Sequence, residues 1–145
     1  MKNFIFGTIV AGLVLAHALP VRAANGAFQG TWKFVAASTD GKADPDTAIA
    51  KLQFIVDGDK YRIVDDGKEQ EVGTLKLAKE GANDTIDWVI ESGDDKGKTQ
   101  HGIYKLAGDT AELAYFAAAK DGRPTEFASK EGVNTSKIQK LPAGK

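Results

Sequence analysis

The chain has 145 residues, with 19 Lys and Arg against 20 Asp and Glu, a formal net charge of −1 and no Cys. A chain of this length corresponds to one domain that can bury a core of its own. Charges of both signs are spread along it, which excludes the concentrated basic face that nucleic-acid binding requires. Without Cys, the fold has no disulfide and no thiol chemistry, and its N-terminus cannot carry a lipid on a cysteine.

Residues 1–23 have the pattern of a cleaved secretory signal peptide. Lys2 supplies a positive start, residues 4–15 are apolar, and residues 21–23 (VRA) place small side chains at both specificity positions before the cleavage point. The alternative is a membrane anchor, but the run is near the lower limit of the ~17–25 residues that a spanning helix needs. Cleavage leaves 122 of the 145 residues, 24–145, with 17 basic and 20 acidic side chains and a net charge of −3. We expect this domain in the periplasm or outside the cell.

After the leader, short runs of alternating apolar and polar residues recur between turns rich in Asp and Gly. Such period-2 alternation is typical of strands with one buried face. Asp44 and Pro45 predict the N-cap and first residue of a short helix that extends through Lys51, between the first two strands. The segment 118–135, poor in apolar residues, is expected to loop over one end of the molecule. Eight strands are predicted, at 32–36, 52–56, 60–64, 75–77, 86–90, 101–106, 111–117 and 136–141.

Eight successive antiparallel strands indicate an all-β, up-and-down barrel, because closure removes the exposed edges of a flat sheet. The interior of an eight-stranded barrel is either filled by side chains or holds one small ligand. An apolar wall with several phenol groups suits a small apolar or amphipathic ligand and suits a filled core equally well. The candidate interior residues are Phe34, Phe54, Tyr61, Ile63, Trp88, Tyr104 and Tyr115.

The segments GTWKFVAASTDGK, FIVDGDKYRI, GTLKL, TIDWVIESGDDKGKTQHGIYKLAGDTAEL and RPTEF follow one another between Gly30 and Phe127. This ordered set resembles a bacterial lipocalin-like family of small exported domains. The resemblance implies an eight-stranded lipocalin-like barrel with no accepted catalytic residues. It also implies that Gly30 and Trp32 open the first strand and close the barrel base, with a basic side chain on the indole. The candidates for that cation are Arg123, Lys137 and Lys140.

Side chains that support catalysis or metal binding are sparse. His101 is the one His of residues 24–145, no Gly-x-Ser-x-Gly motif is present, and the alternation turns His101 toward water. The paired carboxylates lie in turns and lack the spaced ligands of a calcium loop. We therefore expect a monomeric, non-enzymatic domain without cofactor or metal.

Two kinds of partner are consistent with these features. One is a small apolar or amphipathic ligand inside the barrel. The other is a protein, such as an exported hydrolase, bound through the loops of a filled barrel. Neither nucleic acid nor, after cleavage of the leader, a membrane is expected.

Overall fold

The computed structural model describes residues 25–143 of the chain. The predicted signal peptide, residues 1–23, lies outside this part, so its cleavage stays a prediction. The described residues form one 3-10 helix, one α-helix and nine strands. In chain order these are η1 (Gly26–Phe28), β1 (Gly30–Thr39), β2 (Lys42–Ala43), α2 (Asp46–Ile49), β3 (Leu52–Asp57), β4 (Lys60–Asp65), β5 (Lys68–Glu80), β6 (Asn83–Ser92), β7 (Thr99–Ala107), β8 (Thr110–Tyr115) and β9 (Asn134–Lys140).

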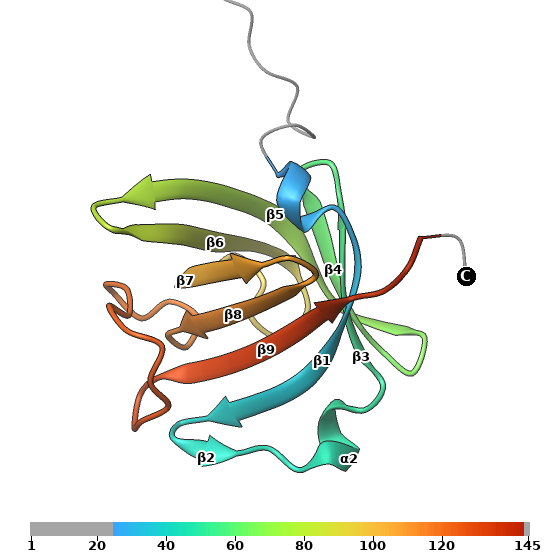
Figure 1. Ribbon diagram of the computed structural model, residues 1–145, viewed down its shortest axis with the longest axis horizontal. Coiled ribbons are helices and arrows are strands. Elements are labelled where there is room, and N and C mark those ends of the chain that lie inside the picture. Colours follow the sequence, from blue (N-terminus) through green and yellow to red (C-terminus); the bar gives the residue numbers. More distant parts are fainter. Residues whose placement is uncertain (1–24, 144–145) are drawn as a thin grey trace, which may run out of the picture.

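Eight of these strands close into one antiparallel barrel in which neighbours along the chain are also neighbours in space (Figure 1). β1 pairs with β3 on one side and with β9 on the other, so the first and last strands close the sheet. The two-residue β2 only extends the far end of β1. The prediction of an all-β, up-and-down, lipocalin-like barrel of eight strands is confirmed, although β5 and β6 are longer than expected.

The segment between the first two barrel strands is helical, as predicted, but shorter. α2 has a single turn of four residues, preceded by Pro45, and no side chain caps its N-terminus. The Asp44 carboxylate accepts a hydrogen bond from Thr39 Oγ1 at 3.0 Å. The prediction of an Asp44 N-cap is therefore wrong, because β1 already engages that carboxylate.

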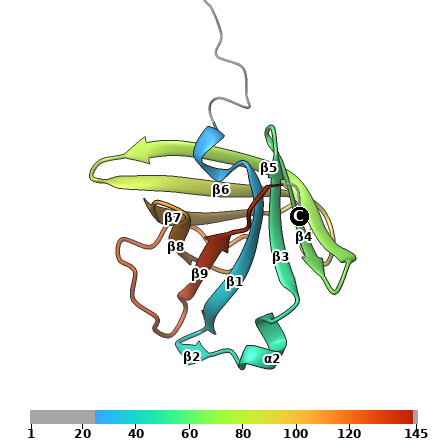
Figure 2. The same cartoon turned by 45° about the vertical axis from the view of Figure 1, so that its right-hand side comes forward.

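The two ends of the barrel differ, and Figure 2 shows η1 and α2 at opposite ends. Where β1 begins, η1 inserts Phe28, whose ring centroid lies 5.5 Å from that of Trp32 and 5.0 Å from that of Tyr104. Trp32 Nε1 donates a hydrogen bond to the Phe28 carbonyl at 2.9 Å. We call this the Trp32 end, and the opposite end, where β1 finishes and α2 follows, the α2 end.

Residues 116–133, which we call the outer loop, lie against the outside of the barrel rather than over one end. Phe116 and Val133 pack on Ile103 and Ala114, which are register partners on β7 and β8. Both partners lie one residue away from interior positions and so face outward. The prediction that this segment covers an end is wrong, because the outer faces of β7 and β8 carry apolar residues that require cover.

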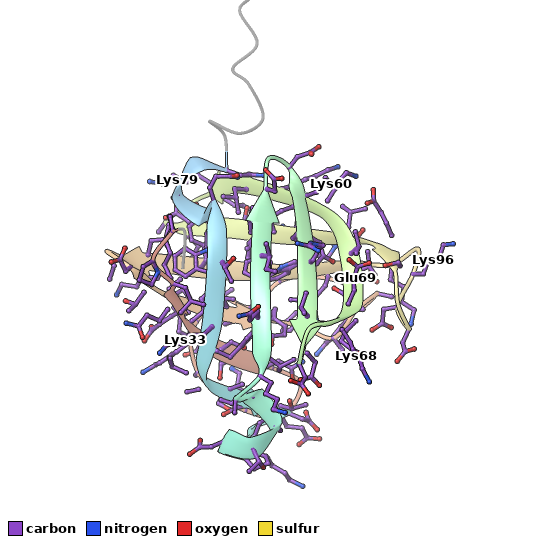
Figure 3. The ribbon with its side chains drawn as sticks, turned by 90° about the vertical axis from the view of Figure 1, so that its right-hand side faces the viewer. Lys33, Lys60, Lys68, Glu69, Lys79 and Lys96 are labelled. Carbon is purple, nitrogen blue, oxygen red and sulfur yellow. The ribbon has the colours of Figure 1, made fainter. Side chains whose placement is uncertain are left out.

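Charged side chains project from the outside of β4 and β5, as Figure 3 shows for Lys60 and Glu69. Lys60 Nζ lies 2.9 Å from Glu91 Oε1, and Arg62 Nη1 lies 3.8 Å from Glu69 Oε2. These side chains are about half exposed, and exposed ion pairs contribute only about 0–1 kcal/mol each. The packed interior is therefore the main source of stability.

Candidate functional site

The seven predicted interior residues all belong to one apolar cluster inside the barrel. Phe54, Tyr61 and Trp88 are buried, with 1%, 0% and 5% of their surface exposed. The four that remain only partly buried are Phe34, Ile63, Tyr104 and Tyr115. The structure thus places these residues where the alternation predicts, while their role in binding a ligand stays a proposal.

The middle of the barrel is filled, because two large rings rest on glycines of neighbouring strands. A methyl group on Gly73 would lie 2.8 Å from Tyr61 Cε1 and would collide with the backbone of β6. One on Gly102 would lie 3.0 Å from Trp88 Cζ3 and 2.7 Å from the Ala114 carbonyl oxygen. Neither glycine has a positive φ, so the backbone conformation does not require glycine here. Glycine is required because a side chain would have no room. Packing of this density leaves no room for a ligand between the rings.

Toward the α2 end, the inward face of the barrel includes a carboxylate. Glu71 of β5 pairs with Ile63 of β4 and shares its inward face. The Tyr61 hydroxyl donates a hydrogen bond to Glu71 Oε1 at 2.7 Å. Burial and the charge of Asp95 raise the pKa of Glu71, although the bond from Tyr61 acts in the opposite direction. Burial and the Glu71 carboxylate raise the pKa of Tyr61 in turn.

Tyr115, the last residue of β8, lies toward the same end of the barrel. Its ring centroid lies 5.5 Å from that of Trp88, and its hydroxyl oxygen lies 3.0 Å from Ser136 Oγ. Burial raises the pKa of Tyr115. The hydrogen bond with Ser136 lowers this pKa, whereas the negative charges of Asp44 and Glu71 raise it further. Glu71 thus acts electrostatically on the Tyr115 phenol as well as on that of Tyr61.

The Trp32 end is closed, and the cation on its indole is Lys140. Trp32 is fully buried, and Lys140, its register partner on β9, holds Nζ 5.8 Å from the ring centroid. Gly30 has a φ of 109°, and a methyl group there would lie 3.2 Å from Lys140 Cε. The expectation that Arg123 helps to close this end is wrong, because its guanidinium binds Asp87 on the outside of the barrel.

Arg123 anchors the outer loop to β6 and β7. Its Nη1 donates to Asp87 Oδ1 and to the Gly102 carbonyl, both at 2.8 Å, and its Nε lies 3.3 Å from Glu80 Oε2. His101 Nδ1 lies 2.8 Å from the same Asp87 oxygen. Burial alone would raise the pKa of Asp87, but the hydrogen bonds from Arg123 and His101 outweigh it and lower that pKa. His101 faces outward, as expected, and its side chain is 35% exposed, but this carboxylate holds its ring.

The two larger of the hollows that border the outer loop lie on the outside of the barrel. One, of about 270 Å³, lies beside Phe127 over β1, β8 and β9. The other, of about 420 Å³, is lined by Thr85, His101 and Arg123, among others. The aromatic residues of the barrel interior line neither of them. Within residues 25–143, no three His, Asp or Glu side chains are grouped so as to hold a metal ion.

Sequence reasoning missed two interior residues. Phe28 lies four residues before Trp32 in GAFQGTW, and its apolar side chain ahead of the first strand was the available signal. Glu71 continues the alternation of Gly73 and Leu75 backward along β5. That signal was present, but a Glu is ordinarily read as a surface residue.

Comparisons with known proteins add little to this description. No family model matches the sequence, and no curated protein matches it. Among solved structures, the chain is similar to a "secretary abundant heat soluble (SAHS) protein" from Ramazzottius varieornatus. The identity is 15%, with 79% of this chain and 96% of that chain covered, and the TM-score is 0.30. A likeness this distant supports no functional conclusion, and the family resemblance noted in the sequence stays a hypothesis.

Proposed function

We propose that this protein is an exported, non-enzymatic barrel domain that binds a small amphipathic molecule at the α2 end of its interior. The observation that carries the proposal is that part of the apolar cluster inside the barrel stays accessible around Phe34 and Tyr115. Trp32, Phe54 and Tyr61 have at most 1% of their surface exposed. Phe34 and Tyr115, which belong to the same apolar cluster, remain partly accessible. Partly accessible apolar surface beside fixed polar groups is the usual composition of a small-molecule site.

The filled middle of the barrel sets the depth of this site. The rings of Tyr61 and Trp88 occupy the space against Gly73 and Gly102. A ligand can therefore insert a short apolar part at the mouth but cannot enter the barrel completely. This shallow mode differs from the enclosed chamber that an eight-stranded barrel can also provide.

The proposals of export and of non-enzymatic action rest mainly on the sequence. The leader pattern in residues 1–23 supports export. In the part of the chain that the structure describes, no helix is long and apolar enough to span a membrane. The chain has no Cys, and Nδ1 of His101 is engaged by Asp87, which leaves no obvious pairing of nucleophile and base.

Titration with N-phenyl-1-naphthylamine, a neutral apolar fluorophore, followed by a series of C8–C14 amphiphiles, tests the binding site. We expect probe fluorescence to rise, Trp emission to change, and the melting temperature to increase. A ligand at a hundredfold excess over Kd stabilises the fold by about 2.7 kcal/mol. Phe34→Ala should weaken binding, whereas Val35→Ala, at an exposed neighbour on β1, should not. No change in any of these signals across the series would contradict the proposal.

The outer loop gives a second candidate function, as the contact surface for a protein partner. The supporting observation is that two hollows border this loop and that Phe127 beside one of them is 37% exposed. Assays of purified exported hydrolases with and without the protein would test it. Inhibition that is lost in Phe127→Ser but kept in Val35→Ser would support this function, and its persistence in both variants would contradict it.

A further inference from the structure

The C-terminal end of β5 has a free edge. β4 pairs with β5 from Lys68 to Thr74, and β5 then continues to Glu80 with β6 as its one partner strand among residues 25–143. In Figures 1 and 2 this end of β5 borders the sheet, with no described strand on its outer side. An unpaired edge presents backbone groups that another strand can bind. Closure of the barrel therefore leaves one short edge open, over residues 76–80.

The hydrogen-bonding groups on this edge follow from those of Leu75. Its N–H donates to the Asp59 carbonyl at 2.7 Å, and its carbonyl accepts a bond from Asn25 Nδ2 at 3.2 Å, so both groups point away from β6. Alternate residues of a strand direct these groups to the same side, so Leu77 and Lys79 face the edge too. In the described part of the chain, no group outside the strand ladders bonds to the backbone of either residue. The edge thus offers two N–H and two carbonyl groups.

The side chains along this edge are charged and exposed. Lys76, Lys79 and Glu80 all lie on the surface, and among the described residues neither lysine belongs to an ion pair. Glu80 Oε2 lies 3.3 Å from Arg123 Nε, but 74% of the Glu80 side chain is exposed. Because Leu77 packs on the core, Lys76 and Glu80 point to the outer face of the sheet. Charges on an edge oppose indiscriminate pairing, so a partner strand must match their order.

We infer that this edge binds the same edge of a second copy of the protein, in an antiparallel two-fold arrangement centred on Ala78. Leu77 of each copy then lies opposite Lys79 of the other, and all four free backbone groups of each edge form hydrogen bonds with the other copy. The same register places Lys76 opposite Glu80, so opposite charges meet on both sides of the axis. The edge is self-complementary, as the interface of a two-fold dimer requires.

Other registers fit this edge less well. Moving the centre by one residue, to Leu77 or to Lys79, halves the number of these hydrogen bonds and separates Lys76 from Glu80. A parallel pairing in register sets each of these charges against its own copy, and like charges directly opposite each other are destabilising. The order Lys-Leu-Ala-Lys-Glu therefore favours a second copy in the antiparallel register.

Sedimentation equilibrium of the exported protein, from about 10 µM to about 1 mM, measures this association. Residues 76–80 form a contact much smaller than the roughly 20–30 residues a side of a stable interface, so we expect a reversible dimer with a Kd of roughly 0.1–1 mM. Lys79→Pro removes an edge N–H that points away from β6 and so leaves the β6 ladder intact. It should weaken the dimer about tenfold or more, because two of its hydrogen bonds are lost.

Exchange of the two facing charges tests the register itself. Glu80→Lys and Lys76→Glu should each weaken self-association, because like charges then face each other across the axis. An equal mixture of the two variants should associate again as a heterodimer, since each Lys meets a Glu. Lys96→Glu, the same charge change at an exposed position beyond the opposite end of β6, should leave the dimer unchanged.

The outcomes decide the inference without involving the ligand site, which shares no residue with this edge. A protein that stays monomeric at about 1 mM, as expected from the sequence alone, overturns it. A dimer that none of the β5 variants weakens overturns it as well, and failure of the mixture to associate overturns the register. Thermal unfolding checks that Lys79→Pro is folded, and the charge exchange decides the inference if it is not.

Discussion

Replacement of Gly102 by Ala tests whether the barrel interior is packed, because the added methyl group has no free space. It would lie 2.7 Å from the Ala114 carbonyl oxygen and 3.0 Å from both Trp88 Cζ3 and Tyr115 Cβ. Carbon atoms at their optimal separation are about 3.5–4.0 Å apart, so backbone or rings must move. Overpacking of this kind costs about 1–3 kcal/mol. The smaller backbone entropy of an unfolded Ala offsets about 0.4–1 kcal/mol of it, so we expect a net loss of about 1–2 kcal/mol.

The assay is urea unfolding followed by circular dichroism and Trp fluorescence, with linear extrapolation to water. Gly73→Ala should lose more stability than Gly102→Ala, because its methyl group meets the Val89 carbonyl even more closely. Gly26→Ala is the matched control, since no atom lies within 4 Å of the added group. If Gly102→Ala is as stable as the unaltered protein, Trp88 is free to move and the packed middle of the barrel is refuted.

Three further predictions concern stability and processing. Trp32→Ala should cost about 3–5 kcal/mol in the same assay, the range for large aromatic deletions, and a loss below about 1 kcal/mol would place Trp32 at the periphery. The pKa of Asp87 is lowered in the folded state, so the ionised carboxylate stabilises the fold at pH values above its unfolded-state pKa of about 3.9. This stabilisation is lost as the pH falls through the folded-state pKa. Asp87→Asn should therefore be about 1–3 kcal/mol less stable at pH 7, and a difference that does not shrink in acid would argue against the ion-paired arrangement. N-terminal sequencing of the exported protein should start at or near Ala24, and a product that keeps residues 1–23 would rule out cleavage.

The barrel could be predicted because each of its strands has one face in a single core. The spacing of Trp32 and Phe34 about Lys33, and of Leu52 and Phe54 about Gln53, is a local signal that can be read without any knowledge of pairing. The prediction from alternation is wrong where the backbone is irregular. A bulge between Phe34 and Ala36 turns Ala36, which the alternation places inside, to an exposed outer position. Nothing in the residues of that run marks the extra step.

The cation on Trp32 shows what local patterns leave undecided. Arg123, Lys137 and Lys140 were equivalent by type, and the choice among them depends on the register of β9 against β1. Lys137 lies on the outer face, where it pairs with Glu112 at 3.5 Å. The role of Arg123 depends on a carboxylate 36 residues away in the chain. Contacts of this range are set by tertiary structure, which periodicity does not encode.

The pairing of β1 with β9 has a consequence for the order in which the protein can fold. Trp32 and Lys140, opposite each other in that pair, stand near the two ends of the chain, so the barrel closes only after almost all of the sequence is available. Until then β1 and β8 each have an unpaired edge, and folds built on such distant contacts form slowly. The same open edges should make a truncation before Asn134 aggregate rather than fold.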